Sequence, residues 1–249
     1  MTAKRNQILA ELKRLYPQAG PELNFSNPYE TLVATILSAQ CTDRQVNKVT
    51  PELFARYPSV EAMAAADVNE VYPIVKSCGF KSKASNIVEA CRLIALRHAG
   101  QVPRTMEELT ALPGVGQKTA NVVLANAFGV PAIAVDTHVF RVSNRLGLAQ
   151  AKNVEQTEKQ LKENVPMKDW IDAHHWLIYH GRRVCHAQNP ACEICTLRSY
   201  CSYGLGEKPS AQDKPKSKGR PSAESSAERQ AKPKWKTSIT GQNKTTAAR

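Results

Sequence analysis

Four of the seven cysteines are crowded into one stretch of 17 residues, a spacing that could hold a metal. They are Cys185, Cys192, Cys195 and Cys201. The loops between them are just long enough to turn each sulfur inward, so the thiolates could enclose a single zinc ion or an iron–sulfur cluster. Spacing alone does not separate these two possibilities. The other thiols are far away in sequence and are expected to be small apolar core residues: Cys41, Cys78 and Cys91.

A second stretch, residues 112–120, is suited to bind phosphate. It reads Leu-Pro-Gly-Val-Gly-Gln-Lys-Thr-Ala, with Gly114 and Gly116 two positions apart. Glycines allow a sharp bend and a close approach of the backbone, and the free N–H groups at the start of the following helix attract anions. The pattern predicts a helix–hairpin–helix that grips the DNA backbone without reading bases. A tight loop that merely ends a helix is the alternative.

Lys118 and Asp136 are the two side chains nearest to these features that could carry a reaction. A lysine amine is almost wholly protonated at neutral pH, because its ordinary pKa is about 10.4. A helix N-terminus and desolvation by a substrate both lower that pKa, which favours Lys118 as a nucleophile over a merely solvated side chain. Asp136 follows an apolar run and is expected to cap a helix. A capping carboxylate can still face a cleft.

The elements that position these residues are predicted to be helices. Residues 27–30, Asn-Pro-Tyr-Glu, combine an N-cap, a proline at the first helical position and a glutamate at the third. Apolar residues recur at helical spacing through most of the chain. Later helices are expected over residues 117–128, 137–146, 154–164 and 170–179. Only residues 130–135 have the composition of a strand, and Pro131 is unfavourable there. The sequence predicts an all-α protein.

The chain has 249 residues and a net charge of +12, which favours an anionic partner such as nucleic acid or a membrane surface. No apolar stretch could span a bilayer, and residues 1–6 lack the apolar run of a signal peptide. We therefore expect a cytoplasmic protein, associated with the nucleoid through DNA. Residues 208–249 carry a net +8 and are expected to be a disordered basic tail, either a solubilising extension or an electrostatic tether to DNA.

Four segments resemble the endonuclease III family of helix–hairpin–helix DNA glycosylases. They are, in chain order, Leu-Ser-Ala-Gln-Cys-Thr-Asp at residues 37–43, residues 112–120, Val-Asp-Thr-His-Val-Phe-Arg-Val at residues 135–142, and the cysteine spacing. The resemblance runs from about Leu9 to Cys201. It implies a [4Fe–4S] cluster held by the four cysteines, and a two-lobed all-α fold with DNA in the cleft. A six-helix lobe with the hairpin would span residues 21–130, and the iron–sulfur lobe would combine residues 1–20 with 131–207.

The resemblance also implies a bifunctional DNA glycosylase and abasic-site (AP) lyase of base excision repair, acting as a monomer. A damaged, oxidised pyrimidine or an abasic site in double-stranded DNA would be the target. The damaged nucleotide is flipped out, Lys118 attacks the sugar C1′, and the resulting Schiff base permits β-elimination. Asp136 would stabilise positive charge on the sugar and help to deprotonate Lys118. The same carboxylate also favours the ammonium form, so the two effects on the lysine oppose each other.

Gln40 resembles the residue with which the family fills the gap left by the flipped base, and Phe80 is the candidate to insert beside it. The other positions expected at DNA are Leu112, Gly114, Val115, Gly116, Thr119 and His138. Two departures from the family are visible. Residues 79–84 are one residue short, in a loop that also enters DNA. Residues 186–191 contain no Lys or Arg, where relatives place basic residues, so Arg198 or the tail would have to compensate.

Several alternatives remain at this point. The adenine-removing branch of the family uses a glutamate on the early helix and lacks the lysine, and residues 31–40 contain no carboxylate, which disfavours it. A relative acting on pyrimidine dimers or mismatched thymine could use the same catalytic pair. A non-catalytic iron–sulfur DNA-binding protein would need neither Lys118 nor Asp136. A zinc-stabilised hairpin protein would be colourless, whereas an iron–sulfur protein would be brown.

Overall fold

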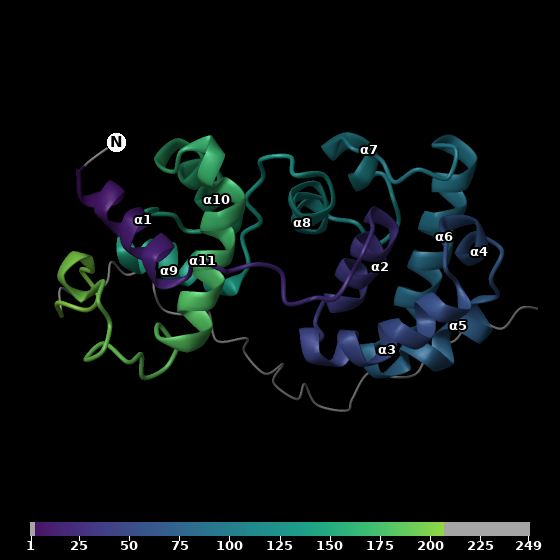
Figure 1. Ribbon diagram of the computed structural model, residues 1–249, viewed down its shortest axis with the longest axis horizontal. Coiled ribbons are helices and arrows are strands. Elements are labelled where there is room, and N and C mark those ends of the chain that lie inside the picture. Colours follow the sequence, from purple (N-terminus) through teal and green to yellow (C-terminus); the bar gives the residue numbers. More distant parts are fainter. Residues whose placement is uncertain (1–2, 207–249) are drawn as a thin grey trace, which may run out of the picture. The chain divides into compact units, whose positions relative to one another are not determined.

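The computed structural model describes residues 3–206, and all regular structure in that range is helical (Figure 1). The helices are α1 (Ala3–Leu15), α2 (Pro28–Ser38), α3 (Asp43–Arg56), α4 (Val60–Ala64), α5 (Val68–Val75), α6 (Lys81–Arg97), α7 (Met106–Thr110), α8 (Gln117–Phe128), α9 (Thr137–Leu146), α10 (Val154–Asn164) and α11 (Trp170–Arg183). Short 3-10 turns occur at η1 (Lys76–Cys78), η2 (Met167–Asp169) and η3 (Arg198–Tyr200). The all-α prediction is confirmed, and the strand-like residues 130–135 form no strand.

Helix α2 begins where the sequence predicts. The side chain of Asn27 accepts a hydrogen bond from the backbone N–H of Glu30 at 2.9 Å, and Pro28 occupies the first helical position. The Glu30 carboxylate in turn accepts from the backbone N–H of Ser26 at 2.7 Å. The first bond satisfies an N–H group that a helix end otherwise leaves free, and the second fixes the residue that precedes the N-cap.

Helices α8, α9 and α10 have the predicted bounds, whereas α11 continues four residues past the predicted Tyr179, to Arg183. Gly181 lies within that extension. A Cβ built on it would lie 3.0 Å from the His138 Cβ and 3.1 Å from Val142. The glycine therefore lets α9 and α11 approach closely, and this tertiary contact outweighs the weak helix propensity of glycine.

The first core is the hydrophobic cluster built by α2 to α8. Helix α2 is its central element, because Tyr29 and every residue from Thr31 to Leu37 are buried. Around it pack large side chains of the neighbouring helices, among them Leu53, Met63, Ile87, Ile94 and Leu109. The hairpin between α7 and α8 packs against this core.

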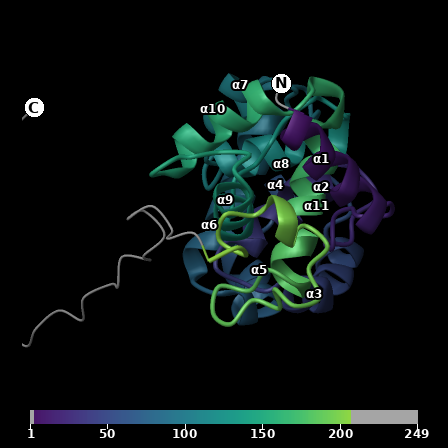
Figure 2. The same cartoon turned by 90° about the vertical axis from the view of Figure 1, so that its left-hand side faces the viewer.

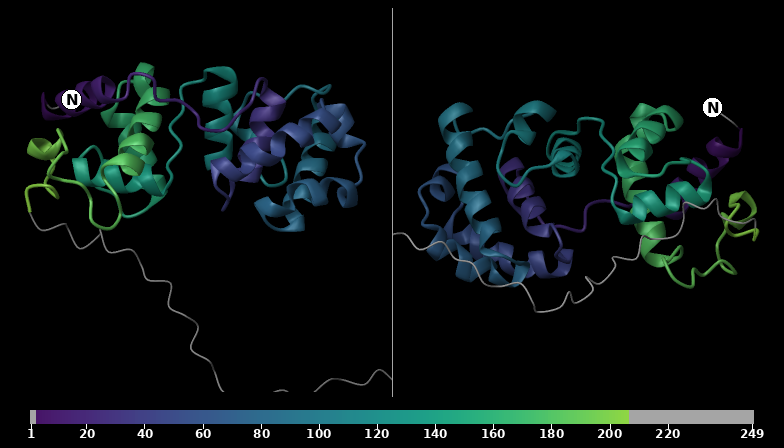
Figure 3. Two further views of the ribbon diagram at one scale, coloured as in Figure 1. Left: turned by 60° about the horizontal axis from the view of Figure 1, so that its bottom comes forward. Right: turned by 180° about the vertical axis from the view of Figure 1, so that it is seen from behind.

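The second core joins the beginning of the described chain to its end. Ile8 and Leu12 of α1 pack with Leu146, Leu161 and Trp176 of the last three helices. The segment after α11 belongs to the same cluster through Leu197 and Cys201, and Figure 2 shows it running beside α11 and α9. Residues 16–27 and 129–136 connect the two cores (Figure 3).

Residues 3–206 belong to one unit of the chain, Met1–Asp213. The tail expected over residues 208–249 lies outside the described residues. Among the described helices, none is both long and apolar enough to cross a membrane.

Candidate active site and cluster site

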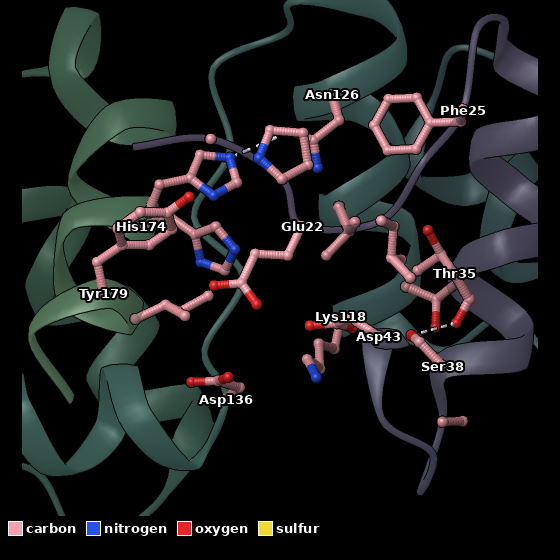
Figure 4. Close-up of a pocket in the computed structure, with 18 of the residues that line it drawn as sticks. Glu22, Phe25, Thr35, Ser38, Asp43, Lys118, Asn126, Asp136, His174 and Tyr179 are labelled. Atoms are coloured by element: carbon pink, nitrogen blue, oxygen red, sulfur yellow. Dashed lines mark hydrogen bonds between the residues drawn. The ribbon is translucent and has the colours of Figure 1, made fainter. Parts of the chain in front are cut away.

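A cavity of about 280 Å³ opens between the two cores, and it contains both predicted catalytic side chains. Its walls come from α2, α8, α11 and the segments that connect the cores. Figure 4 shows Lys118 and Asp136 entering from separate walls, with the lysine amine directed toward the open space. The volume is near the lower end of ligand pockets, about 300–1,000 Å³, so the cavity suits one small ring system.

Lys118 reaches the cavity because it lies in the first turn of α8, directly after the hairpin turn. Gly114 in that turn has a φ of +77°, and an added Cβ would lie 2.9 Å from the Asn86 amide nitrogen. Gly116 is the N-cap of α8 and provides no side-chain cap. Nothing lies within 4 Å of a Cβ built on it. The first N–H groups of α8 are therefore open to a phosphate.

Asp136 is the N-cap of α9, as predicted. Its Oδ1 atom accepts hydrogen bonds from the backbone N–H groups of His138 and Val139, both at 2.8 Å. Among the described residues none donates a hydrogen bond to Oδ2. One oxygen thus fixes the carboxylate to the helix, and the other stays available to a cationic group in the cavity.

Two adjacent buried histidines form another wall. His174 Nδ1 lies 2.7 Å from the Ala134 carbonyl, so this nitrogen carries the proton. His175 Nε2 lies 3.2 Å from the Asn126 side-chain oxygen, and the two imidazole rings are 4.9 Å apart. Burial lowers the pKa of His174 and lowers the pKa of His175 to about 3. Both rings are therefore neutral at physiological pH and offer polar edges without charge.

An ion-pair group spans the same cavity. Arg182 of α11 donates to the carboxylate of Glu22 and, at 2.8 Å, to that of Asp43. Glu22 belongs to the segment between α1 and α2, and Asp43 is the first residue of α3. Arg182 therefore fastens a helix of the second core to the first core.

The predicted DNA-contacting residues fall into four places. Gln40 and Thr119 line the cavity with Lys118. Phe80 stands outside it, 84% exposed, as the N-cap of α6. The remaining predicted positions belong to the hairpin and to the start of α9.

In the hairpin, the side chains of Leu112 and Val115 are buried in the first core, so only their backbone could touch DNA. At the start of α9, the His138 ring packs against Gly181 and its Nδ1 lies 3.1 Å from Arg141. Burial lowers the pKa of His138.

Sequence reasoning missed part of the cavity wall. The missed residues are Glu22, Asn126, His174, His175, Tyr179 and Arg182. None lies in a motif, and only the adjacent histidines, on a helix with apolar neighbours, gave a signal.

The four clustered cysteines line a second cavity, between α11, α9 and the segment that follows α11. Arg145 Nη1 lies 3.3 Å from the Cys185 sulfur, and the backbone N–H of Gly204 lies 3.4 Å from the Cys201 sulfur. Thiolates, which only accept, are stabilised by such donors. Arg145 is 8% exposed, and its Nε atom has no hydrogen-bond partner. A buried guanidinium beside the Cys185 sulfur, at a cavity lined by all four cysteines, fits an anionic metal–thiolate group.

Comparison with known proteins decides the family. Residues 33–167 match the HhH-GPD superfamily of base excision DNA repair proteins, and residues 185–201 match the iron–sulfur binding domain of endonuclease III. Endonuclease III of Escherichia coli is 49% identical over 81% of this chain and 96% of its own length. The chain belongs to the endonuclease III family. Endonuclease III of Synechocystis is 50% identical, over 80% of this chain and 91% of the relative.

Solved structures of the endonuclease III family agree with this assignment. A non-covalent endonuclease III–DNA complex superposes with a TM-score of 0.78 at 44% identity, covering 83% of this chain and 98% of that one. A trapped endonuclease III–DNA covalent intermediate gives a TM-score of 0.77, and the match covers 83% of this chain and 99% of that one. The predicted helix–hairpin–helix glycosylase fold is confirmed, and the chain is a DNA-binding enzyme of base excision repair. The iron–sulfur match confirms the expected [4Fe–4S] cofactor over zinc.

Proposed function

We propose that this endonuclease III family member removes oxidised pyrimidines from double-stranded DNA and cleaves the resulting abasic site, with Lys118 as the nucleophile. The observation that carries the proposal is the meeting of Lys118 and Asp136 in one base-sized cavity beside the hairpin (Figure 4). The hairpin N–H groups would hold the backbone of the lesion strand, which places the flipped sugar at the mouth of the cavity.

Each side chain has a distinct task in this proposal. The neutral amine of Lys118 attacks C1′, the bond from C1′ to the base breaks, and the base leaves with the bonding electrons. Loss of a second amine proton and opening of the sugar give the Schiff base. Removal of a C2′ proton then expels the 3′ phosphate. Asp136 Oδ2 lies free to stabilise positive charge on the sugar and to accept the lysine proton.

The neutral histidine wall would act on the flipped base. His174 Nδ1 already donates to a backbone carbonyl, so the ring cannot swing freely. A fixed, uncharged imidazole edge on the cavity wall can form directional hydrogen bonds with the edge of a pyrimidine. Damaged bases cost the least to unstack, and the size and polar lining of the cavity suit a single pyrimidine ring.

We propose that Cys185, Cys192, Cys195 and Cys201 ligate the [4Fe–4S] cluster. When bound, the cluster crosslinks the segment after α11 and can carry an electron. The residues around it hold the loop: Arg145 donates to the Ala187 and His186 carbonyls at 3.2 and 2.8 Å, and its guanidinium lies 4.0 Å from the centre of the Tyr203 ring. These contacts support a structural role first.

We further propose that the protein acts as a cytoplasmic monomer with two lobes, residues 21–130 and residues 1–20 with 131–207. The two separate hydrophobic cores support that division.

The test is borohydride trapping on a duplex with one abasic site, comparing the wild type with Lys118→Gln. We expect a covalent protein–DNA adduct for the wild type and none for Lys118→Gln, with DNA binding retained. Lys13→Gln is the matched control, because Lys13 is exposed on α1 and lies outside the cavity. A brown, DNA-binding wild type that gives no adduct would contradict the lyase activity.

A further inference from the structure

Lys83 makes an unusual set of hydrogen bonds near the two loops expected to enter DNA. Its ammonium donates to the backbone carbonyls of Leu37, at 2.8 Å, of Cys78, at 2.5 Å, and of Ala39. An ammonium has three N–H groups, so three carbonyls satisfy it fully. Lys83 lies in the first turn of α6, where the helix dipole disfavours a cation. The carbonyls must therefore provide the stabilisation that keeps the side chain in place.

Two of these carbonyls belong to a helix end that lacks donors. Helix α2 ends at Ser38, and the last carbonyls of a helix have no partner within it. A cation is favoured there by the helix dipole. Lys83 thus caps α2 from a position 46 residues away from Leu37.

The third carbonyl ties a second loop to the same ammonium. Cys78 ends η1, and Gly79 follows with a φ of +132°. A Cβ built on Gly79 would lie 3.4 Å from the Lys83 Nζ and 3.5 Å from its Cε, so the loop runs directly along the lysine side chain. Gln45 reinforces the junction, because its amide donates to the Ser77 hydroxyl at 2.8 Å.

The residues that follow these anchored carbonyls are the two candidates for insertion into DNA. Gln40 follows Ala39 and has a φ of +57°, a conformation that costs a non-glycine residue about 1–2 kcal/mol. Phe80 follows Gly79 with its ring 84% exposed. Neither side chain is held by the core, so the backbone must hold both in place.

We propose that Lys83 is a positioning residue, whose ammonium clamps the Gln40 loop and the Phe80 loop together so that both enter the base stack in register. The proposal rests on the function proposed above. Base flipping costs a few kcal/mol of stacking and pairing, and the groups that fill the gap must be in place when the base leaves. A misplacement of about 1 Å can reduce the rate about 100-fold. Lys83 would set this geometry without touching the reacting atoms.

The test compares Lys83→Met, which keeps the aliphatic stem and removes all three donors, with a matched control on the same helix. Arg92→Met is that control, because Arg92 also donates to backbone carbonyls at another helix end, those of Ala64 at 3.0 Å and Ala66 at 3.4 Å. Both substitutions remove one cation from α6 and the hydrogen bonds with which it caps the end of another helix, α2 or α4. Only Lys83→Met releases the two loops.

Three measurements are made on the cluster-loaded protein. Hydrogen exchange in the free protein should become faster in Lys83→Met only, at the hydrogen-bonded amides of Ala39, Cys41 and Gly79. Single-turnover base removal is measured on a duplex with one oxidised pyrimidine, and borohydride trapping on a duplex with a preformed abasic site. We expect the ratio of base removal to trapping to fall about 10- to 100-fold in Lys83→Met. In Arg92→Met that ratio should stay at the wild-type value.

Unchanged exchange or an unchanged ratio in Lys83→Met would overturn the clamp. Equal losses in base removal and trapping would also overturn it, because they indicate general damage to the fold. A wild type that neither removes the base nor traps on the abasic site would instead contradict the proposed function. Exchange in the free protein would still show whether Lys83 holds the loops.

Discussion

Arg182 and Asp43 are joined at 2.8 Å across the cavity, although 139 residues separate them in the chain. We predict that Arg182→Met lowers the free energy of unfolding by about 1 kcal/mol, because the pair is partly exposed and screened by water. It also leaves two carboxylates unpaired beside the path of DNA, so DNA affinity should fall. Thermal unfolding at about 50 and 500 mM NaCl checks the origin of the effect, since the loss should shrink in salt.

The control for that pair is Arg56→Met. Arg56 pairs with Glu70 at 3.0 Å, and both side chains are more than half exposed. Its removal should change stability little. If both substitutions lowered DNA affinity equally, the predicted specific contribution of Arg182 to DNA binding would be contradicted.

Asp136 has two roles that different substitutions can separate. Asparagine is as good an N-cap as aspartate, so Asp136→Asn should keep both bonds to the α9 backbone and change stability by less than about 0.5 kcal/mol. Asp136→Ala removes them and should cost about 1–2 kcal/mol. Both substitutions remove the charge and should reduce base removal to a similar extent. Urea unfolding and single-turnover kinetics, measured on the same preparations, check this.

One result would contradict a role for the Asp136 charge in base removal. If Asp136→Asn removes bases as fast as the wild type while Asp136→Ala does not, the carboxylate acts only as a cap. The charge would then have no part in the reaction.

The sequence predicts those parts of the site that depend on residues close to one another in the chain. The N-cap of α2, the hairpin turn and the cap at Asp136 depend on residues within a few positions of one another, and all three occur as expected. The cavity wall formed by His174, His175 and Arg182 depends on contacts between segments that are distant in sequence. Lys83, which lies outside the cavity, also depends on distant contacts: its side chain has the pattern of an ordinary solvated lysine on α6 until α2 and η1 are placed beside it.

The end of α11 also could not be predicted from neighbouring residues alone. A glycine in the last turns of a predicted helix indicates an end, and the prediction stops at Tyr179. In the structure the missing side chain of Gly181 allows contact with His138, a contact between helices that no local pattern encodes. Packing between helices thus overrides local propensity.

The buried histidines predict a loss of stability in mild acid. The ordinary pKa of His175 is 6.5, and burial lowers it to about 3 in the folded protein. Below pH 6.5, His175 binds a proton in the unfolded chain but stays neutral in the folded chain. The contribution of His175 to stability is therefore complete above pH 6.5 and is lost as the pH falls toward 3. At about pH 5 the loss from this group is about 2 kcal/mol. His174 acts in the same direction.

Urea unfolding of the wild type and His175→Gln between about pH 5 and pH 7.5 isolates this contribution. The difference in unfolding free energy between the two should shrink as the pH falls. The groups that face the pair are Asp136, Lys118 and Arg182, and they are the same in both proteins. A difference that stays constant with pH would contradict a buried neutral His175.

The same substitution should lower stability at one hairpin glycine and leave it unchanged at the other. Gly114 has a φ of +77°, and an added Cβ would meet Asn86 at 2.9 Å. Gly114→Ala should therefore lower the free energy of unfolding by about 1–2 kcal/mol through its left-handed backbone alone. Gly116 has a φ of −92°, and its Cβ would meet nothing within 4 Å. Gly116→Ala should leave the thermal midpoint near that of the wild type.

DNA affinity separates the two glycines further. The space beside Gly116 is empty in the protein and lies at the free N–H groups of α8, where a phosphate would approach. An alanine methyl there should weaken binding to an abasic-site duplex in a fully folded protein, whatever the sequence of the duplex. Fluorescence anisotropy together with thermal unfolding measures both quantities on one sample. If Gly116→Ala binds as tightly as the wild type, the phosphate is held elsewhere, and the empty space at the hairpin has no part in DNA binding.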